Sequence, residues 1–99
     1  VLLFDDLRLL EGRELSLLAS STEIADWANL YPRMEAEFCE KLKEELSETA
    51  WKIIEETNRY EKASDEKAER SMENIVKKAE DLVYEGRIKK PEIKSIQRT

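Results

Sequence analysis

The residues of this chain that could carry out chemistry are mostly carboxylates. Glu37, Glu40, Glu44 and Glu48 follow one another at helical spacing, so on a single helix they would share one side. Such a row could bind a divalent cation or act as a paired acid and base. However, 23 acidic residues in a chain of 99 produce such rows by chance. We therefore interpret the row as a solvated helix face, and we expect no metal, cofactor or small-molecule substrate.

The residue types on which many enzymes rely are absent. The chain contains no histidine, which excludes Ser-His-Asp and Cys-His devices and removes the usual zinc and iron ligand. Its two glycines, Gly12 and Gly86, cannot form a phosphate-binding loop. Cys39 lies beside an apolar stripe and is expected to be a small buried hydrophobe rather than a reactive thiol. The sequence predicts a protein that is not an enzyme.

Charge is divided unevenly along the chain. Residues 1–86 hold 12 of the 17 basic and 22 of the 23 acidic residues, a net charge of −10, whereas residues 87–99 carry a net charge of +4. We accordingly divide the chain into a helical domain at 1–86 and a basic, extended tail or linker at 87–99. An acidic body with a basic end indicates a contact made by that end, with a partner protein, with nucleic acid or with the body itself.

The overall composition is that of a globular helical domain. Hydrophobic and charged residues each make up 40% of the chain, which has only two glycines and two prolines. The abundance of Glu and Lys is typical of thermophile proteins. A single cysteine excludes an internal disulfide and favours a reducing, cytoplasmic setting. The sequence shows neither a long apolar run that would span a membrane nor the basic start of a signal peptide.

Hydrophobic periodicity predicts an all-α fold. In the first 18 residues, leucines at helical spacing are interrupted by Gly12, which divides them into two short helices. Ser20 and Glu23 have the form of a capping box, so a short helix is expected to follow, and Pro32 ends it.

The strongest helical pattern lies between residues 33 and 62, about 45 Å if it is one helix. Apolar residues recur there at steps of three or four, and the stripe is formed by Met34, Phe38, Leu42, Leu46, Ala50, Ile53, Thr57 and Tyr60, with Trp51 and Ile54 widening it. A last helix begins after Ser64 and stops at Gly86. We predict a bundle of three to four helices in which these two long helices are antiparallel.

Two groups of residues are candidates for contacts between helices or with partners. The first group, expected in helix packing or in an oligomer interface, consists of Phe38, Leu42, Leu46, Trp51, Ile54, Met72, Ile75, Val76 and Leu82. The second group, expected to bind a partner through the tail, consists of Arg87, Ile88, Lys89, Lys90, Ile93, Lys94, Ile96 and Arg98. The spaced isoleucines of the tail favour docking on a protein surface.

The order of these features resembles the helical domain of GINS subunits, which belong to the replicative helicase assembly of archaea and eukaryotes. The segment Tyr31-Pro-Arg and the residues that follow it to Leu42 look like the proline-led second helix of that domain. Residues 73–90 look like its third helix with a basic end. The resemblance covers roughly residues 30–90, and it implies a non-enzymatic scaffold that forms a multimer and bridges helicase and polymerase or primase factors.

Three functions remain open at this point. The first is a non-catalytic helical scaffold subunit of an intracellular multiprotein assembly, such as a DNA-replication complex, with a protein partner or further copies of itself. The alternative is a nucleic-acid-binding accessory protein that acts through residues 87–99, although the net −10 of the body should repel phosphate. An enzyme built on carboxylates ranks last.

Overall fold

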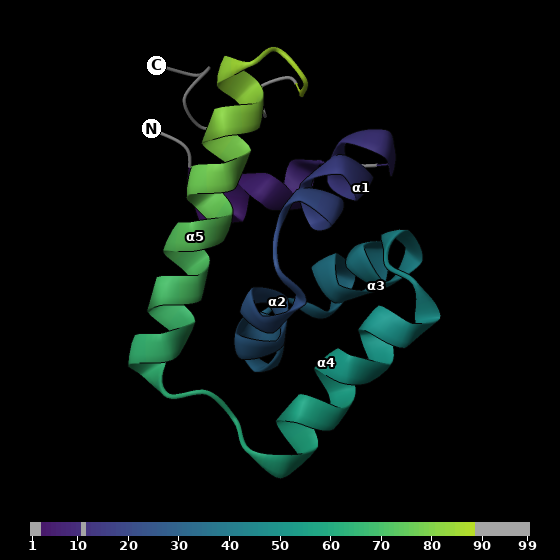
Figure 1. Cartoon of the computed structure of the whole chain (residues 1–99), viewed down its shortest axis with the longest axis vertical. Helices are drawn as coiled ribbons and strands as arrows, with labels where there is room; N and C mark the ends of the chain where they lie inside the picture. Colours follow the sequence, from purple (N-terminus) through teal and green to yellow (C-terminus); the bar gives the residue numbers. More distant parts are fainter. Residues whose placement is uncertain (1–2, 11, 89–99) are drawn as a thin grey trace.

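The computed structural model describes residues 3–10 and 12–88, and these fold into five α-helices and two 3-10 helices without a β-strand (Figure 1). In chain order the elements are η1 (Phe4–Leu9), α1 (Gly12–Ser21), α2 (Ile24–Leu30), η2 (Tyr31–Arg33), α3 (Ala36–Glu45), α4 (Glu48–Tyr60) and α5 (Asp65–Tyr84). The prediction of an all-α fold is confirmed. The helices are shorter and more numerous than the three or four that the sequence predicted.

The single helix expected over residues 33–62 is wrong, because the chain is extended at Leu46 and Ser47. Leu46 has φ −98° and ψ 153°, and Ser47 has φ −67° and ψ 156°, both outside the helical region. The Ser47 hydroxyl accepts a hydrogen bond of 3.1 Å from the backbone N–H of Ala50 and so caps α4. Pro32, expected to end the short helix before it, lies in η2, just after α2 ends at Leu30.

This break changes which side chains of α4 face the core. Ala50, Trp51 and Ile54 are buried, whereas Ile53 is 46% exposed and Tyr60 is 88% exposed. A continuous helix would have carried the stripe of α3 onward through Ile53 and Tyr60. The two extended residues reset the helical phase, so the predicted stripe is wrong at Ile53, Thr57 and Tyr60, while Trp51 and Ile54, which were expected to widen it, are buried.

The ends of α5 agree with the sequence. The Ser64 hydroxyl accepts a hydrogen bond of 3.3 Å from the backbone N–H of Lys67 at the start of the helix. Gly86 follows its C-terminus at φ +76°, a conformation that favours glycine. The N–H of Arg87 reaches the carbonyl of Leu82 at 2.9 Å, and the N–H of Gly86 reaches that of Val83 at 3.0 Å. This pair of bonds is a Schellman motif.

The capping box expected at Ser20 is wrong. Ser20 lies in the last turns of α1, where its hydroxyl donates a hydrogen bond of 3.0 Å to the carbonyl of Leu17. The next helix, α2, begins only at Ile24, and Glu23 precedes it without a capping side-chain hydrogen bond.

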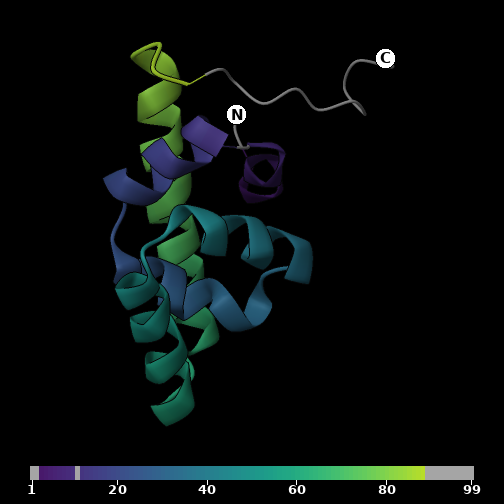
Figure 2. The same cartoon turned by 90° about the vertical axis from the view of Figure 1, so that its right-hand side faces the viewer.

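The two long helices are not the paired antiparallel helices that the sequence predicted. The short helix α2 lies between α4 and α5 and packs against both (Figure 1). Helix α1 packs against α3, and both α1 and η1 pack against α5. Figure 2 shows the shorter helices standing in front of α5, which at 20 residues is about 30 Å long. The short central helix therefore replaces the direct contact expected between the long ones.

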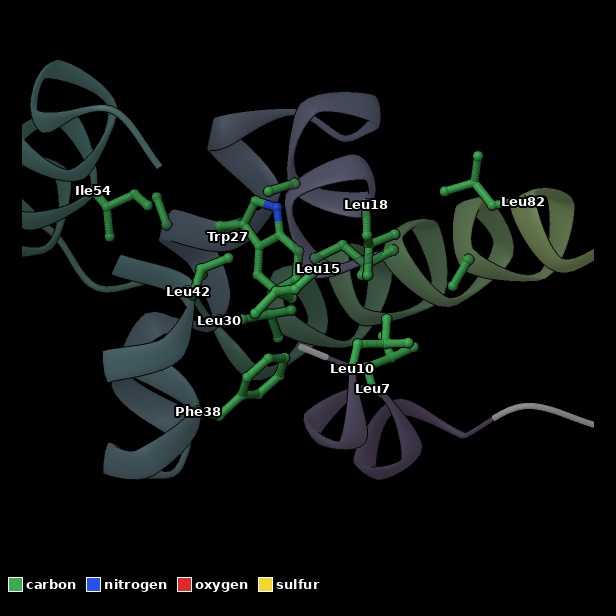
Figure 3. Packing of buried hydrophobic residues seen from close by; sticks show 14 of the residues in the cluster. Leu7, Leu10, Leu15, Leu18, Trp27, Leu30, Phe38, Leu42, Ile54 and Leu82 are labelled. Carbon is green, nitrogen blue, oxygen red and sulfur yellow. The ribbon is translucent and has the colours of Figure 1, made fainter. Parts of the chain in front are cut away.

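Trp27 of α2 lies at the centre of the core (Figure 3). Its side chain is fully buried, and its ring packs edge-on against Phe38 of α3 at a centroid distance of 6.2 Å. The indole N–H donates a hydrogen bond of 2.7 Å to the hydroxyl of Thr22, so the one polar atom of the ring is satisfied. Leucines of η1, α1, α2 and α3 surround the ring, and Ile75 of α5 belongs to the same cluster.

Candidate interaction surface

Helix α4 carries a row of alternating charges, which we call the α4 charge stripe: Glu48, Lys52, Glu55 and Arg59. The spacings of four, three and four residues place all four side chains on one side of the helix. All four are exposed. Within residues 3–10 and 12–88 none of them forms an ion pair, so the favourable Glu48–Lys52 pairing suggested by their spacing does not occur. The row is available to a partner.

A different side of α4 from the stripe holds the helix in place. Trp51 packs edge-on against Tyr31 of η2 at a centroid distance of 5.3 Å. Ile54 is fully buried, and the side-chain amide of Asn58 donates a hydrogen bond of 2.8 Å to the backbone carbonyl of Ala28 in α2. These contacts fix the rotation of α4 about its own axis and thereby direct the stripe outward.

Helix α4 also carries two exposed apolar side chains and borders a surface hollow. Ile53 and Tyr60 are two of the five large hydrophobic side chains that are exposed in the described part of the chain. The hollow has a volume of about 480 Å³, is flanked by Lys43 and Trp51, and includes the first three residues of the stripe in its lining. Charge with some apolar area is a common composition for the rim of a protein interface.

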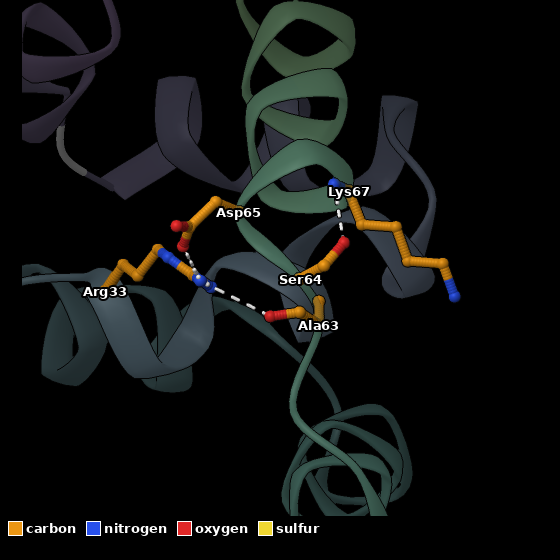
Figure 4. A network of polar contacts seen from close by, with 5 residues as sticks. All are labelled: Arg33, Ala63, Ser64, Asp65 and Lys67. Atoms are coloured by element: carbon orange, nitrogen blue, oxygen red, sulfur yellow. Dashed lines mark hydrogen bonds and ion pairs between the residues drawn. The ribbon is translucent and has the colours of Figure 1, made fainter.

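A polar clip links η2 to the start of α5 (Figure 4). The Arg33 guanidinium donates a hydrogen bond of 2.6 Å to the Asp65 carboxylate and one of 3.3 Å to the backbone carbonyl of Ala63. The clip therefore joins the two ends of the segment that contains α3 and α4.

Charges on other helices are partly engaged. On α5, Glu66, Arg70, Glu73, Lys77 and Glu80 form a comparable alternating row. There Arg70 lies 3.0 Å from Glu66, and Glu80 also has an interaction. The row on α5 is thus less available than the row on α4.

The carboxylates singled out in the sequence do not form a metal site. Glu37, Glu40 and Glu44 lie on α3, and the extended residues 46 and 47 separate them from Glu48 on α4. In the described part of the chain, no three or more Cys, Asp or Glu side chains come together as metal ligands. Cys39 is half-buried, and its burial, together with the negative charge of Glu40, raises the pKa of the thiol above its usual value.

The residues proposed for helix packing lie in or against the hydrophobic core. The buried ones are Phe38, Leu42, Trp51, Ile54, Ile75 and Leu82, and the partly buried ones are Leu46, Met72 and Val76. Of the proposed tail residues, Ile88 is only 4% exposed and belongs to the core, while Arg87 is exposed and lies 3.9 Å from Glu85. Lys89, Lys90, Ile93, Lys94, Ile96 and Arg98 lie outside the described residues.

A comparison with protein families shows to which family the chain belongs. The model of the FliG C-terminal domain family matches residues 1–89. The chain belongs to this family. Comparisons with curated proteins and with solved structures gave no match. The FliG C-terminal domain is a helical protein-interaction domain of a non-enzymatic flagellar motor switch protein.

Membership of the FliG C-terminal domain family overturns the resemblance to GINS subunits and with it the role in DNA replication. That resemblance depended on the order of amphipathic helices and on a proline before one of them, features that many helical domains share. Among the described residues, no helix is both long and apolar enough to cross a membrane.

The α4 charge stripe is not among the contact candidates taken from the sequence. Of its residues, only Glu48 was considered there, as part of a solvated face. The sequence signal for the stripe is Ser47, which is a typical N-cap residue. A new helix that starts at Glu48 need not continue the apolar stripe of the helix before it.

Proposed function

We propose that this chain is a non-catalytic protein-interaction domain of the flagellar motor switch, and that the α4 charge stripe is its main contact surface. Family membership supports the setting, since FliG C-terminal domains interact with FliM and with MotA-type stator proteins. A cytoplasmic location is part of the same proposal, because FliG stands on the cytoplasmic side of the motor.

One observation supports the α4 charge stripe as the contact surface. Four exposed charges of alternating sign stand in a row on a helix whose other side is fixed in the core. Exposed charges at an interface contribute mostly to the rate of encounter and to the choice of partner. A rigidly oriented alternating row can select a partner with the complementary order of charges. Because the contact is made by exposed charges, the binding is weak and reversible.

The basic tail remains a second proposed contact. Residues 87–99 carry a net charge of +4, and Ile88 near its start is buried in the core. We propose that the isoleucines and basic residues beyond Ile88 bind a partner protein. Family membership gives no support to nucleic acid as that partner.

Titration of the chain with its cognate FliM and with the cytoplasmic part of its cognate MotA-type protein tests this function. Wild-type chain is expected to bind at least one of them, and the double variant Lys52→Glu/Arg59→Glu is expected to bind about tenfold or more weakly. Lys77→Glu on α5 is the control for a charge reversal. Unchanged affinity in the α4 variant would rule out the stripe as the contact surface.

A further inference from the structure

We infer that the α4 charge stripe also pairs with the same stripe of a second copy of this chain, in antiparallel orientation. This inference rests on the proposed function in that it uses the same surface. From the N-terminus the charges run negative, positive, negative, positive. Read from the other end, the order is inverted. An antiparallel copy therefore sets every acid opposite a base.

The pairing is self-complementary in the way that a two-fold interface requires. Glu48 lies opposite Arg59 of the second copy, and Lys52 lies opposite Glu55. The two-fold axis then repeats both pairs, since residue i meets j and residue j meets i. A parallel copy in register would instead set like charges against each other, so the order of charges also selects the orientation.

The geometry of α4 allows all the pairs to form together. Glu48 and Arg59 are eleven residues apart, which is about three turns, so the row runs nearly parallel to the helix axis and is about 16 Å long. Packed helices lie about 8–10 Å apart, a distance that the long side chains of Lys, Arg and Glu can bridge. The inner side of α4 is occupied by the core contacts of Trp51 and Ile54, so the stripe can meet a second copy without unfolding.

The association is weak and depends on salt. Exposed ion pairs contribute at most about 1 kcal/mol each, and salt screens them. One pair of 13-residue helices also buries far less area than a standard stable interface. We therefore expect a dimer that is populated at high protein concentration and low ionic strength, and copies held close together by a larger assembly would pair more readily.

Sedimentation equilibrium of the 99-residue chain at about 1 mM protein tests the pairing, first at about 20 mM and then at about 500 mM salt. Dimerisation is expected at low salt and should be lost at high salt. The variants Lys52→Glu and Glu55→Lys should each lower the association constant about tenfold or more, because each sets two pairs of like charges against one another. Lys77→Glu serves as the control and should leave association unchanged.

The decisive sample is an equal mixture of Lys52→Glu and Glu55→Lys. In the mixed dimer the new Glu at 52 meets the new Lys at 55, and the remaining Lys52 meets the remaining Glu55. Association should return to the wild-type level although neither variant associates alone. Rescue also shows that both variants fold. No rescue, an equal loss in Lys77→Glu, or a wild-type chain that stays monomeric at low salt would each overturn the pairing.

The result is separable from the test of the proposed function. A wild-type chain that stays monomeric but binds FliM or the MotA-type protein through the stripe contradicts only the self-pairing. A chain that dimerises with rescue but binds neither motor protein contradicts only the proposed function.

Discussion

Asn58 supplies the hydrogen bond that Pro32 cannot give to Ala28. In a continuous helix the carbonyl of residue 28 would accept from the N–H of residue 32, but proline has no N–H. The side-chain amide of Asn58 on α4 occupies that place, 2.8 Å from the Ala28 carbonyl oxygen, and it also donates to the Ile54 carbonyl at 2.9 Å. The end of α2 is thus completed by a side chain that lies 30 residues further along the chain.

Replacing Asn58 by alanine should lower the free energy of unfolding by about 1–3 kcal/mol, because the Ala28 carbonyl loses its partner between two packed helices. Urea denaturation followed by circular dichroism measures the change. Asn74→Ala is the matched control, since Asn74 is exposed and makes only a 3.5 Å contact with Asp26. An equal loss in the two variants would contradict the role of Asn58.

The two serine caps should be worth about 1 kcal/mol each. Ser47→Ala and Ser64→Ala remove the acceptors for the N–H groups of Ala50 and Lys67. Ser20→Ala should change stability by no more than about 0.5 kcal/mol, because Ser20 is exposed and caps no helix. The same denaturation experiment compares the three variants. A larger loss at Ser20 than at Ser47 would contradict the break between α3 and α4.

Ile88 should matter for stability more than its place near the end of the chain suggests. It is 4% exposed, and its backbone N–H lies 3.4 Å from the carbonyl of Leu82. Ile88→Ala should cost about 2–5 kcal/mol. A chain that ends at Gly86 should be destabilised in the same way, whereas one that ends at Ile88 should not. Leu9→Ala, at a leucine that is 49% exposed, is the control and should cost much less.

The thiol of Cys39 should react slowly. Burial, assisted by the negative charge of Glu40, raises its pKa, so less thiolate is present at any given pH near neutrality. Its rate of alkylation by iodoacetamide should lie below that of a small free thiol and keep rising at a pH where the rate of the free thiol has levelled off. Glu40→Gln removes the smaller cause and should raise the rate slightly. A rate equal to that of the free thiol would contradict the effect of burial.

The sequence predicts helix content well and helix boundaries unevenly. Gly12 and Gly86 mark real interruptions, since both have positive φ, and Ser64 is a real cap. The break at Leu46 and Ser47 was not predicted, because the segments on both sides of it are good helix formers. The positions of α3 and α4 are decided by their contacts with α1 and α2. Local patterns do not contain that information.

The candidate surface was harder to predict than the fold. Its four residues become one row only after the helical phase of α4 is known, and the phase depends on the break. The same dependence explains Ile53 and Tyr60, which look like core residues on a continuous helix and are exposed on the real one. An interaction surface also makes few contacts within its own chain, so the sequence pattern that marks a core cannot mark it.

The central position of α2 has a consequence for how the domain folds. Seven residues are too few for a helix that persists alone in water. Both α4 and α5 nevertheless take their main packing partner from it, although α5 also packs against η1 and α1, so α2 and its two neighbours stabilise one another. We therefore expect α2, α4 and α5 to form together around Trp27, through contacts between distant parts of the chain. Loss of either contact of α2 should therefore weaken the other.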